Sequence, residues 1–229
     1  MSSGFIHLVP TPIGNRDDIT LRALKILAEA DAIACEDTRH SSPLLQYHGI
    51  QKPLISLHEH NEVRRIPELI ERVRQGEKIA IITDAGMPGI SDPGYRLVQR
   101  CIEESISYEV LPGPSAILNA LIGSGFPCHC FSFGGFLSVK KGKRAQVLKA
   151  AIEAGHTHIF FESPHRLPST LEILADLQPQ ARVCVARELT KKFETFHRDT
   201  AQNLNTYFQN QAPKGEIVIL VHGNPDTGV

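Results

Sequence analysis

Polar side chains gather in five short clusters, and each cluster directly follows an apolar run of the chain. Carboxylate, imidazole and amide groups can accept a proton or hold hydroxyl groups and cations. In open α/β sheets, ligands bind outside the carboxyl ends of the strands. Turns favour the same residue types, but five such clusters favour one shared ligand cleft. The clusters are Thr11-Pro-Ile-Gly-Asn15, Glu36-Asp-Thr-Arg39, His58-Glu-His-Asn61, residues 84–92 and Glu162-Ser-Pro-His-Arg166.

The segment 84–94 is the most informative of these clusters because it is rich in glycine and proline. Glycine lets the backbone approach a ligand closely, and proline limits the freedom of the loop. We interpret it as a binding loop in which Asp84 accepts hydrogen bonds from ribose hydroxyls or an ammonium group. The alternative is a tight structural turn in which Asp92 caps the next helix. The glycines and prolines are Gly86, Pro88, Gly89, Pro93 and Gly94.

Several common catalytic and cofactor motifs are absent from the sequence. It has no dinucleotide fingerprint after a strand, no Walker-type phosphate loop, no H-E-x-x-H and no G-x-S-x-G elbow. His58 and His60 would give a metal ion only two ligands from one strand end, and Cys128 and Cys130 are only one residue apart. We therefore predict no metal site.

Strand-like and helix-like segments alternate along almost the whole chain, which predicts the α/β class. The fully apolar strand at residues 79–83 is typical of a sheet that is covered on both faces. Pro43 is expected at the first position of a short helix. The rigid turn Pro112-Gly-Pro-Ser115 is the best candidate boundary between two α/β halves.

Composition excludes several classes of protein. The 229 residues hold 24 Lys and Arg against 25 Asp and Glu, so the net charge of −1 argues against binding nucleic acid through bulk charge. Five cysteines, an odd number, in a chain of this size favour a reducing compartment. No signal peptide is visible, and no apolar run reaches the ~18 residues of a membrane span. We expect a cytoplasmic protein with no membrane segment.

Further motifs complete the pattern, and together with the clusters they run in one order through nearly the whole chain. This ordered set resembles the tetrapyrrole methylase superfamily, and within it the small-subunit ribosomal RNA methyltransferase I family, the 16S rRNA (cytidine-2'-O)-methyltransferases. The further motifs are Leu111-Pro-Gly-Pro-Ser-Ala116, Arg187-Glu-Leu-Thr190 and Lys214-Gly-Glu216.

The resemblance implies two α/β/α domains, residues 1–113 and 114–229, with S-adenosyl-L-methionine folded into the cleft between them. It also implies a homodimer, and it makes the stop at Val229 a departure, because many members continue into a small helical extension. Cofactor contacts are carried over by motif to Pro12, Asp84, Ala85, Gly86, Met87, Ser115, Ala116, Phe161, Glu162, Arg187, Glu188, Gly215 and Glu216.

Methylation of a ribose hydroxyl requires alignment of the reacting atoms and help with one proton. His58, Glu36 and Lys214 are the candidate catalytic residues, and Asp37 and Glu162 are further candidate proton acceptors. Histidine is favoured among the acceptors because it ordinarily titrates near neutral pH. We interpret residues 138–144, which include Lys143 and Arg144, as a mobile basic loop. The predicted substrate contacts, chiefly to RNA phosphates, are Asn15, Arg39, Asn61, Lys140, Lys141 and Arg166.

Two other functions stay open at this point. The neutral net charge suits a small-molecule methylase that acts on a corrin or another tetrapyrrole. A non-catalytic RNA- or ribosome-binding module that kept the fold would not bind S-adenosylmethionine. The leading hypothesis is a methyltransferase for small-subunit ribosomal RNA.

Overall fold

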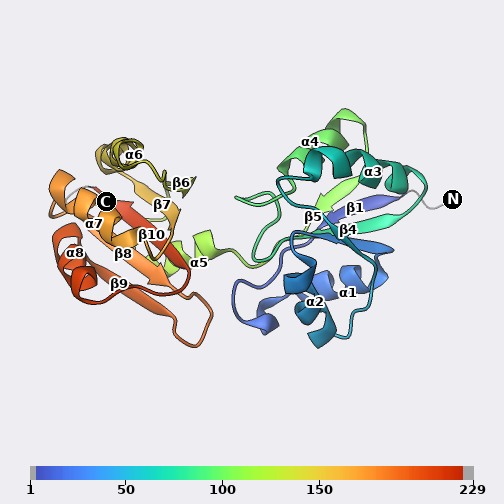
Figure 1. The fold of residues 1–229 in the computed structure, drawn as a ribbon, viewed down its shortest axis with the longest axis horizontal. Coiled ribbons are helices and arrows are strands. Elements are labelled where there is room, and N and C mark those ends of the chain that lie inside the picture. Colours follow the sequence, from blue (N-terminus) through green and yellow to red (C-terminus); the bar gives the residue numbers. More distant parts are fainter. Residues whose placement is uncertain (1–3, 224–229) are drawn as a thin grey trace. The chain divides into compact units, whose positions relative to one another are not determined.

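The computed structural model describes residues 4–223. The chain divides into two compact units, Met1–Ser115 and Ala116–Val229. Each unit contains one five-stranded sheet with helices packed against it (Figure 1). Within the described residues, none of the helices has the length and apolar character that crossing a bilayer requires.

Unit 1 is built on a sheet whose strands are all parallel, in the order β3-β2-β4-β1-β5. Parallel pairing places the carboxyl ends of all five strands at one edge of the sheet. The strands are β1 (Phe5–Leu8), β2 (Ala32–Cys35), β3 (Leu54–Ser56), β4 (Lys78–Ile82) and β5 (Tyr108–Val110).

Both faces of this sheet are covered, as the apolar run at 79–83 predicts. Ile79 and Ile81 of β4 pack with α3 (Glu62–Arg74) and α4 (Tyr95–Glu103). Ala80 and Ile82 alternate with them and pack with α1 (Leu21–Glu29) and α2 (Thr38–Tyr47) on the opposite face. Figure 1 shows these two helix pairs on the two sides of the sheet.

The start of α2 differs from the sequence prediction, which placed Pro43 in the first turn. The helix begins at Thr38, because Asp37 caps it by accepting a hydrogen bond from the Arg39 amide at 2.8 Å. Pro43 therefore lies inside the helix. A favourable cap outweighed the preference of proline for the first helical position.

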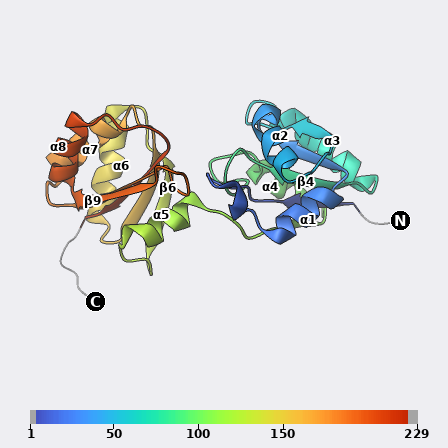
Figure 2. The same cartoon turned by 90° about the horizontal axis from the view of Figure 1, so that it is seen from below.

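Unit 2 holds a mixed sheet in the order β6-β7-β10-β8-β9, in which only β6 and β7 pair in parallel. Helices α6 (Lys141–Glu153), α7 (Leu167–Leu177) and α8 (Ala201–Asn210) share its main core. Helix α5 (Ala116–Ser124) packs on β8, β9 and β10, and Figure 2 shows it apart from the other three. The strands are β6 (Phe131–Phe136), β7 (Thr157–Glu162), β8 (Arg182–Arg187), β9 (Thr195–Thr200) and β10 (Ile217–His222).

Candidate active site

Four of the five polar clusters meet at the carboxyl edge of the parallel sheet in unit 1. They follow β1, β2, β3 and β4, which lie side by side in that sheet. The fifth cluster, residues 162–166, follows β7 in unit 2. The strand-end rule thus brings four of the five polar clusters together, within one unit.

A short backbone pairing joins the first cluster to the glycine-rich loop. The Thr11 amide donates to the Gly86 carbonyl, and the Gly86 amide donates to the Thr11 carbonyl, both at 3.0 Å. The buried Thr11 hydroxyl also donates to the Thr83 carbonyl at 3.0 Å. Gly86 has φ +80°, a left-handed conformation that favours glycine. This pairing fixes the loop beside Pro12, which is buried.

The rest of the glycine-rich loop is also tightly folded. The Gly89 amide donates to the Pro93 carbonyl at 2.9 Å, and Gly94 has φ +131°. A Cβ atom at Gly94 would lie 3.1 Å from the Gly89 nitrogen. Gly94 is the N-cap of α4, so the alternative in which Asp92 caps this helix is wrong. Asp92 therefore does not cap α4.

Carboxyl groups from three segments interact at this edge. The Asp37 amide donates to Asp84 Oδ1 at 3.2 Å, which joins the ends of β2 and β4. Burial, followed by the charges of Glu36 and Asp84, raises the pKa of Asp92 to about 7. Burial and the charge of Asp84 likewise raise the pKa of Glu36, against a lowering contribution from His58. Glu36, Asp84 and Asp92, which we call the acidic cluster, thus carry negative charge that is costly to hold together.

His58 lies beside the acidic cluster, in the turn after β3. Its amide donates to Asn61 Oδ1 at 2.9 Å, and the Asn61 side chain donates to the Ser56 carbonyl at 3.2 Å. In the described part of the chain, His58 Nδ1 is buried without a hydrogen-bond partner. The Asn61 amide group holds the turn, so its predicted substrate contact stays a prediction.

Two other predicted substrate residues of unit 1 also have local partners. The side chain of Asn15 accepts a hydrogen bond from the Asp17 amide at 3.1 Å and caps a 3-10 turn, Arg16–Asp18. Arg39 is 89% exposed and pairs with Asp37 at 2.7 Å. Hydrogen bonds from Arg39 lower the pKa of Asp37 to about 2. Both side chains remain at the surface, where a substrate could reach them.

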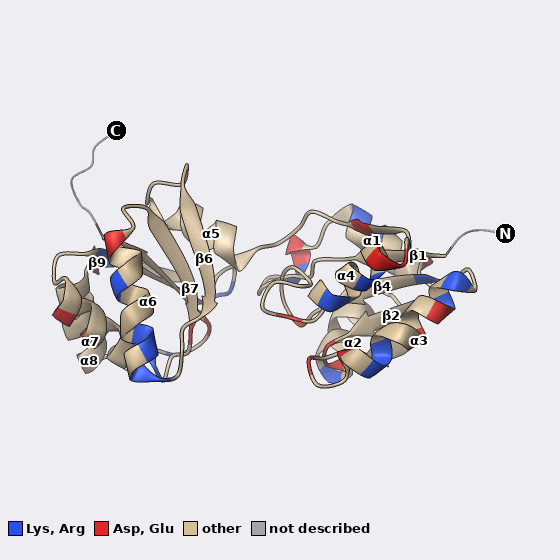
Figure 3. Ribbon diagram, turned by 90° about the horizontal axis from the view of Figure 1, so that it is seen from above, with Lys and Arg blue, Asp and Glu red and all other residues tan. Residues whose placement is uncertain are grey.

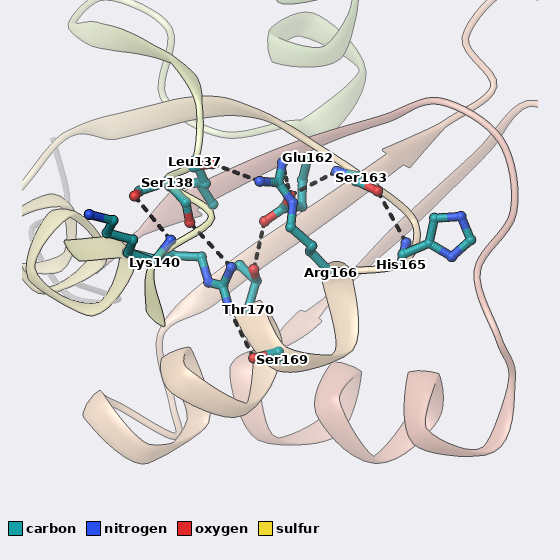
Figure 4. Close-up of polar contacts among 10 residues, drawn as sticks. Leu137, Ser138, Lys140, Glu162, Ser163, His165, Arg166, Ser169 and Thr170 are labelled. Atoms are coloured by element: carbon teal, nitrogen blue, oxygen red, sulfur yellow. Dashed lines mark hydrogen bonds and ion pairs between the residues drawn. The ribbon is translucent and has the colours of Figure 1, made fainter. Parts of the chain in front are cut away.

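The fifth cluster is organised around the buried carboxylate of Glu162 (Figure 4). One oxygen accepts from the Ser163 amide at 2.7 Å and pairs with Arg166 at 2.8 Å. The other accepts from the Thr170 hydroxyl at 2.6 Å. The carboxylate is therefore a fixed internal part of unit 2, and its predicted roles in cofactor binding and proton transfer stay predictions.

The strand ends of β8 and β10 bring two distant motifs together. The Glu188 carboxylate accepts from the Glu216 amide at 2.8 Å and from Lys191 Nζ at 3.0 Å. The Glu216 amide and Lys191 lower the pKa of Glu188. A Cβ atom at Gly215 would lie 2.3 Å from this carboxylate, so Glu188 packs directly over the glycine. This close approach gives a physical reason for the glycine.

The remaining predicted residues are divided between the units. Arg187 donates to the Lys214 carbonyl at 3.1 Å, and the Lys214 side chain is exposed. Lys214 belongs to unit 2, whereas the other candidate catalytic residues belong to unit 1. Ser115 ends unit 1, and Ala116 is the first residue of α5.

Comparison with known proteins identifies the family. A model of the tetrapyrrole (corrin/porphyrin) methylases matches residues 6–205. Over 220 residues the chain is 44% identical to the ribosomal RNA small subunit methyltransferase I of Thermotoga maritima, covering 96% of this chain and 99% of that protein. The chain belongs to this family. The protein of the same name from Escherichia coli O157:H7 is 45% identical over 226 residues, covering 97% of this chain and 79% of that protein.

Solved structures agree with the fold of this methyltransferase family. A diphthine synthase superposes with a TM-score of 0.73 at 15% identity, covering 96% of this chain and 90% of that one. The cobalt precorrin-4 methyltransferase CbiF superposes with a TM-score of 0.70 at 16% identity, covering 96% and 95%. The predicted fold class and family resemblance are therefore confirmed.

The basic stretch of this methyltransferase departs from the sequence prediction. The prediction of a mobile loop at 138–144 is wrong from Lys141 onward, because α6 begins there. Arg144 is only 4% exposed and donates to Ser138 and Ser169. Lys141 pairs with Glu172 at 3.2 Å. The first turn of α6 therefore occupies part of the stretch that was predicted to be a loop.

Some groups at the two strand-end edges were not singled out by sequence reasoning as site residues. Asp92 was weighed only as a helix cap, although it follows a glycine-rich loop that was already predicted to bind a ligand. Lys191 directly follows the Arg187-Glu-Leu-Thr190 motif and pairs with Glu188 and Glu216. Among the described residues, no group of histidine, cysteine, aspartate or glutamate side chains is arranged to hold a metal ion.

Proposed function

We propose that this protein is an S-adenosylmethionine-dependent methyltransferase that modifies the ribose 2'-oxygen of a cytidine in small-subunit (16S) ribosomal RNA. The observation that carries the proposal is the near-full-length identity of 44–45% to proteins named ribosomal RNA small subunit methyltransferase I. The motif residues of unit 1 that lie at one sheet edge support it.

The donor set at the carboxyl edge of unit 1 fits this cofactor. S-adenosylmethionine carries two positive charges, a sulfonium and an ammonium, together with ribose hydroxyls and an adenine. Asp84 and the main-chain groups of Ala85, Gly86 and Met87 would hold it, beside Glu36 and Asp92, whose pKa values are raised by burial and by neighbouring carboxylates. Pro12, Ser115 and Ala116 would add main-chain contacts. Contacts from unit 2 would come from Phe161, Glu162, Arg187, Glu188, Gly215 and Glu216.

S-adenosylmethionine supplies an electrophilic methyl group. The residues of this chain must align the ribose hydroxyl and accept the proton that it loses as the oxygen–carbon bond forms and the methyl carbon–sulfur bond breaks, with the electron pair of that bond going to sulfur. Glu36 and His58 are the proposed proton acceptors. The pKa of Glu36 is raised by burial, which brings a carboxylate closer to the range in which a general base works best. Lys214 would neutralise charge on the RNA.

The substrate partner that we propose is the small ribosomal subunit or its RNA, which places the protein in the cytoplasm. Asn15, Arg39, Asn61, Lys140 and Lys141 are the proposed substrate contacts. We also propose a homodimer, as the family resemblance implies. Sedimentation equilibrium of the full chain would show twice the monomer mass, and a monomer at micromolar concentration would contradict this part.

A methyl-transfer assay tests the function directly. The purified chain is incubated with S-adenosylmethionine labelled in its methyl group and either small ribosomal subunits or a reduced tetrapyrrole. We expect label in a cytidine of the RNA, located on the ribose by nucleoside mass spectrometry. Label in the tetrapyrrole alone would support a small-molecule methylase. Absence of both label transfer and cofactor binding by calorimetry would support a non-catalytic binding module.

A further inference from the structure

The basic start of α6 lies at the same sheet edge as the fifth polar cluster. Strands β6 and β7 run in parallel, and Phe136 lies opposite Phe161 in their register. The Leu137 amide then donates to the Phe161 carbonyl at 3.3 Å. The chain therefore leaves β6 beside Glu162 and enters α6 four residues after Leu137.

Two arginines hold the segment that joins β6 to α6 (Figure 4). Arg166 donates to the Leu137 carbonyl at 3.1 Å, while its other nitrogen pairs with Glu162 at 2.8 Å. Arg144 donates to the Ser138 carbonyl at 3.3 Å and to the Ser169 hydroxyl at 2.9 Å. Because each guanidinium bridges this segment to the start of α7 or to the end of β7, residues 137–138 are held on both sides.

The lysines beyond this segment remain at the surface. Lys140 and Lys143 are exposed, and no ion pair involves either ammonium group in residues 4–223. Lys141, between them, pairs with Glu172. Figure 3 shows positive residues gathered at this end of α6. The dipole of a helix makes positive charge unfavourable at its first turn, and the first turn of α6 contains no acidic residue to offset these lysines. Helix stability therefore does not explain these lysines.

We infer that Lys140 and Lys143 contact the phosphate backbone of the RNA substrate, and that Arg144 and Arg166 are positioning residues that hold the segment leading into those lysines at the strand-end edge of unit 2. This inference rests on the proposed function and deepens it. Lysine is suited to phosphate as a point charge, whereas the arginine fork reaches a carbonyl and a second acceptor at once. The division of roles follows from burial, because Arg144 is buried and Lys143 is exposed.

The salt dependence of RNA binding tests the lysines. A protein that loses two phosphate contacts loses about 1.4–1.8 from the slope of log affinity against log salt concentration. We expect this change when Lys140 and Lys143 are both replaced by alanine, using a fluorescently labelled fragment of small-subunit RNA. The matched control is Lys149→Ala, an exposed lysine further along α6 that pairs with Glu153.

The positioning role is tested by kinetics. Arg144→Lys and Arg166→Lys keep the charge but lose the fork, so we expect KM for RNA to rise about tenfold with kcat and calorimetric cofactor affinity unchanged. A merely structural role would instead lower kcat and cofactor affinity, together with the midpoint of urea unfolding.

The inference would be overturned if the double lysine variant kept the wild-type slope, or if Lys149→Ala changed the slope as much as removing either Lys140 or Lys143. Failure of the proposed function gives a different pattern: no methyl transfer by the wild-type protein, whatever the slopes. RNA binding is measured without turnover, so the two results are separate.

Discussion

The carboxylates at the strand ends of unit 1 and unit 2 have different neighbours: those of unit 2 are paired with hydrogen-bond donors and cations, whereas those of unit 1 lie beside other carboxylates. In unit 2, Glu162 is buried against Arg166, Ser163 and Thr170, and Glu188 is held by Lys191 and the Glu216 amide. In unit 1, Asp92 is half-buried beside Glu36 and Asp84, and its pKa rises to about 7. Similar residues at similar positions thus face opposite electrostatic environments.

The difference indicates which edge is built for a ligand. A buried carboxylate with a full set of donors stabilises its surroundings and has little capacity for another partner. A carboxylate beside other carboxylates gains from a proton or an added cation. We therefore propose that the positive charges of the cofactor lie chiefly against unit 1, and that Glu162 and Glu188 mainly hold in place the strand ends from which the proposed unit 2 contacts come.

The largest expected effect is on stability, at Glu162. Glu162→Ala leaves Arg166 without its buried partner and should lower the free energy of unfolding by about 3–5 kcal/mol. Urea denaturation of the full chain measures this. Glu172→Ala, which removes an exposed partner of Lys141, is the control and should change stability by less than about 1 kcal/mol. Equal effects would contradict this role of Glu162.

The second effect concerns cofactor affinity, at Asp84. Asp84→Asn keeps the shape of the side chain but removes a charge that we propose faces the cofactor. Loss of one member of a charged pair costs about 2–5 kcal/mol, so affinity should fall about 30-fold or more. Calorimetry with S-adenosylmethionine measures it. Asp176→Asn, at an exposed position of α7, is the control. Unchanged affinity in Asp84→Asn would remove unit 1 as the main binding region.

A third effect separates two glycines. Gly86 has φ +80° and pairs with Thr11, so Gly86→Ala should lower stability by about 1–2 kcal/mol and weaken cofactor binding. Gly142 lies in α6 with open space around it, so Gly142→Ala should raise stability by about 0.5–1 kcal/mol. Thermal unfolding shows the sign of each. Unchanged or raised stability in Gly86→Ala would argue against the assigned loop conformation, and destabilisation by Gly142→Ala would argue against the open helical position of Gly142.

The smallest effect is a pH dependence at Asp92. Its pKa is raised in the folded protein to about 7, so the folded state holds a proton that the unfolded state releases above about pH 4. Stability from this group therefore falls as pH rises from about 4 to about 7. Asp92→Asn should match the wild type near pH 4 and exceed it by about 1 kcal/mol at pH 8, after allowance for partial exposure. An equal difference at both pH values would contradict the raised pKa.

Local pattern predicted much of the fold. The apolar run at 79–83 falls within one residue of β4, and the turn Pro112–Ser115 falls at the boundary between the two units. The starts of α2 and α6 were missed because the Asp37 cap and the full length of β6 depend on neighbours that a single segment does not reveal. The motifs identified the family, but composition alone did not.

The site was predicted less completely than the fold. Strand-end position correctly brought Glu36, His58 and Asp84 to one edge of unit 1. The acidic cluster could be identified only from three-dimensional contacts, because Asp92 lies far from Glu36 in the sequence. The charge pattern also did not show that Arg144 differs from its neighbouring lysines, since only the packing in the structure reveals that Arg144 is buried.

The most direct measurement is mass spectrometry of small-subunit ribosomal RNA from a strain that lacks the gene, complemented with the wild-type protein or with Asp84→Asn. We predict that one cytidine loses its ribose methyl group in the deletion strain, regains it with the wild-type protein, and stays unmethylated with Asp84→Asn. Unchanged ribose methylation of every small-subunit cytidine in the deletion strain would contradict the account.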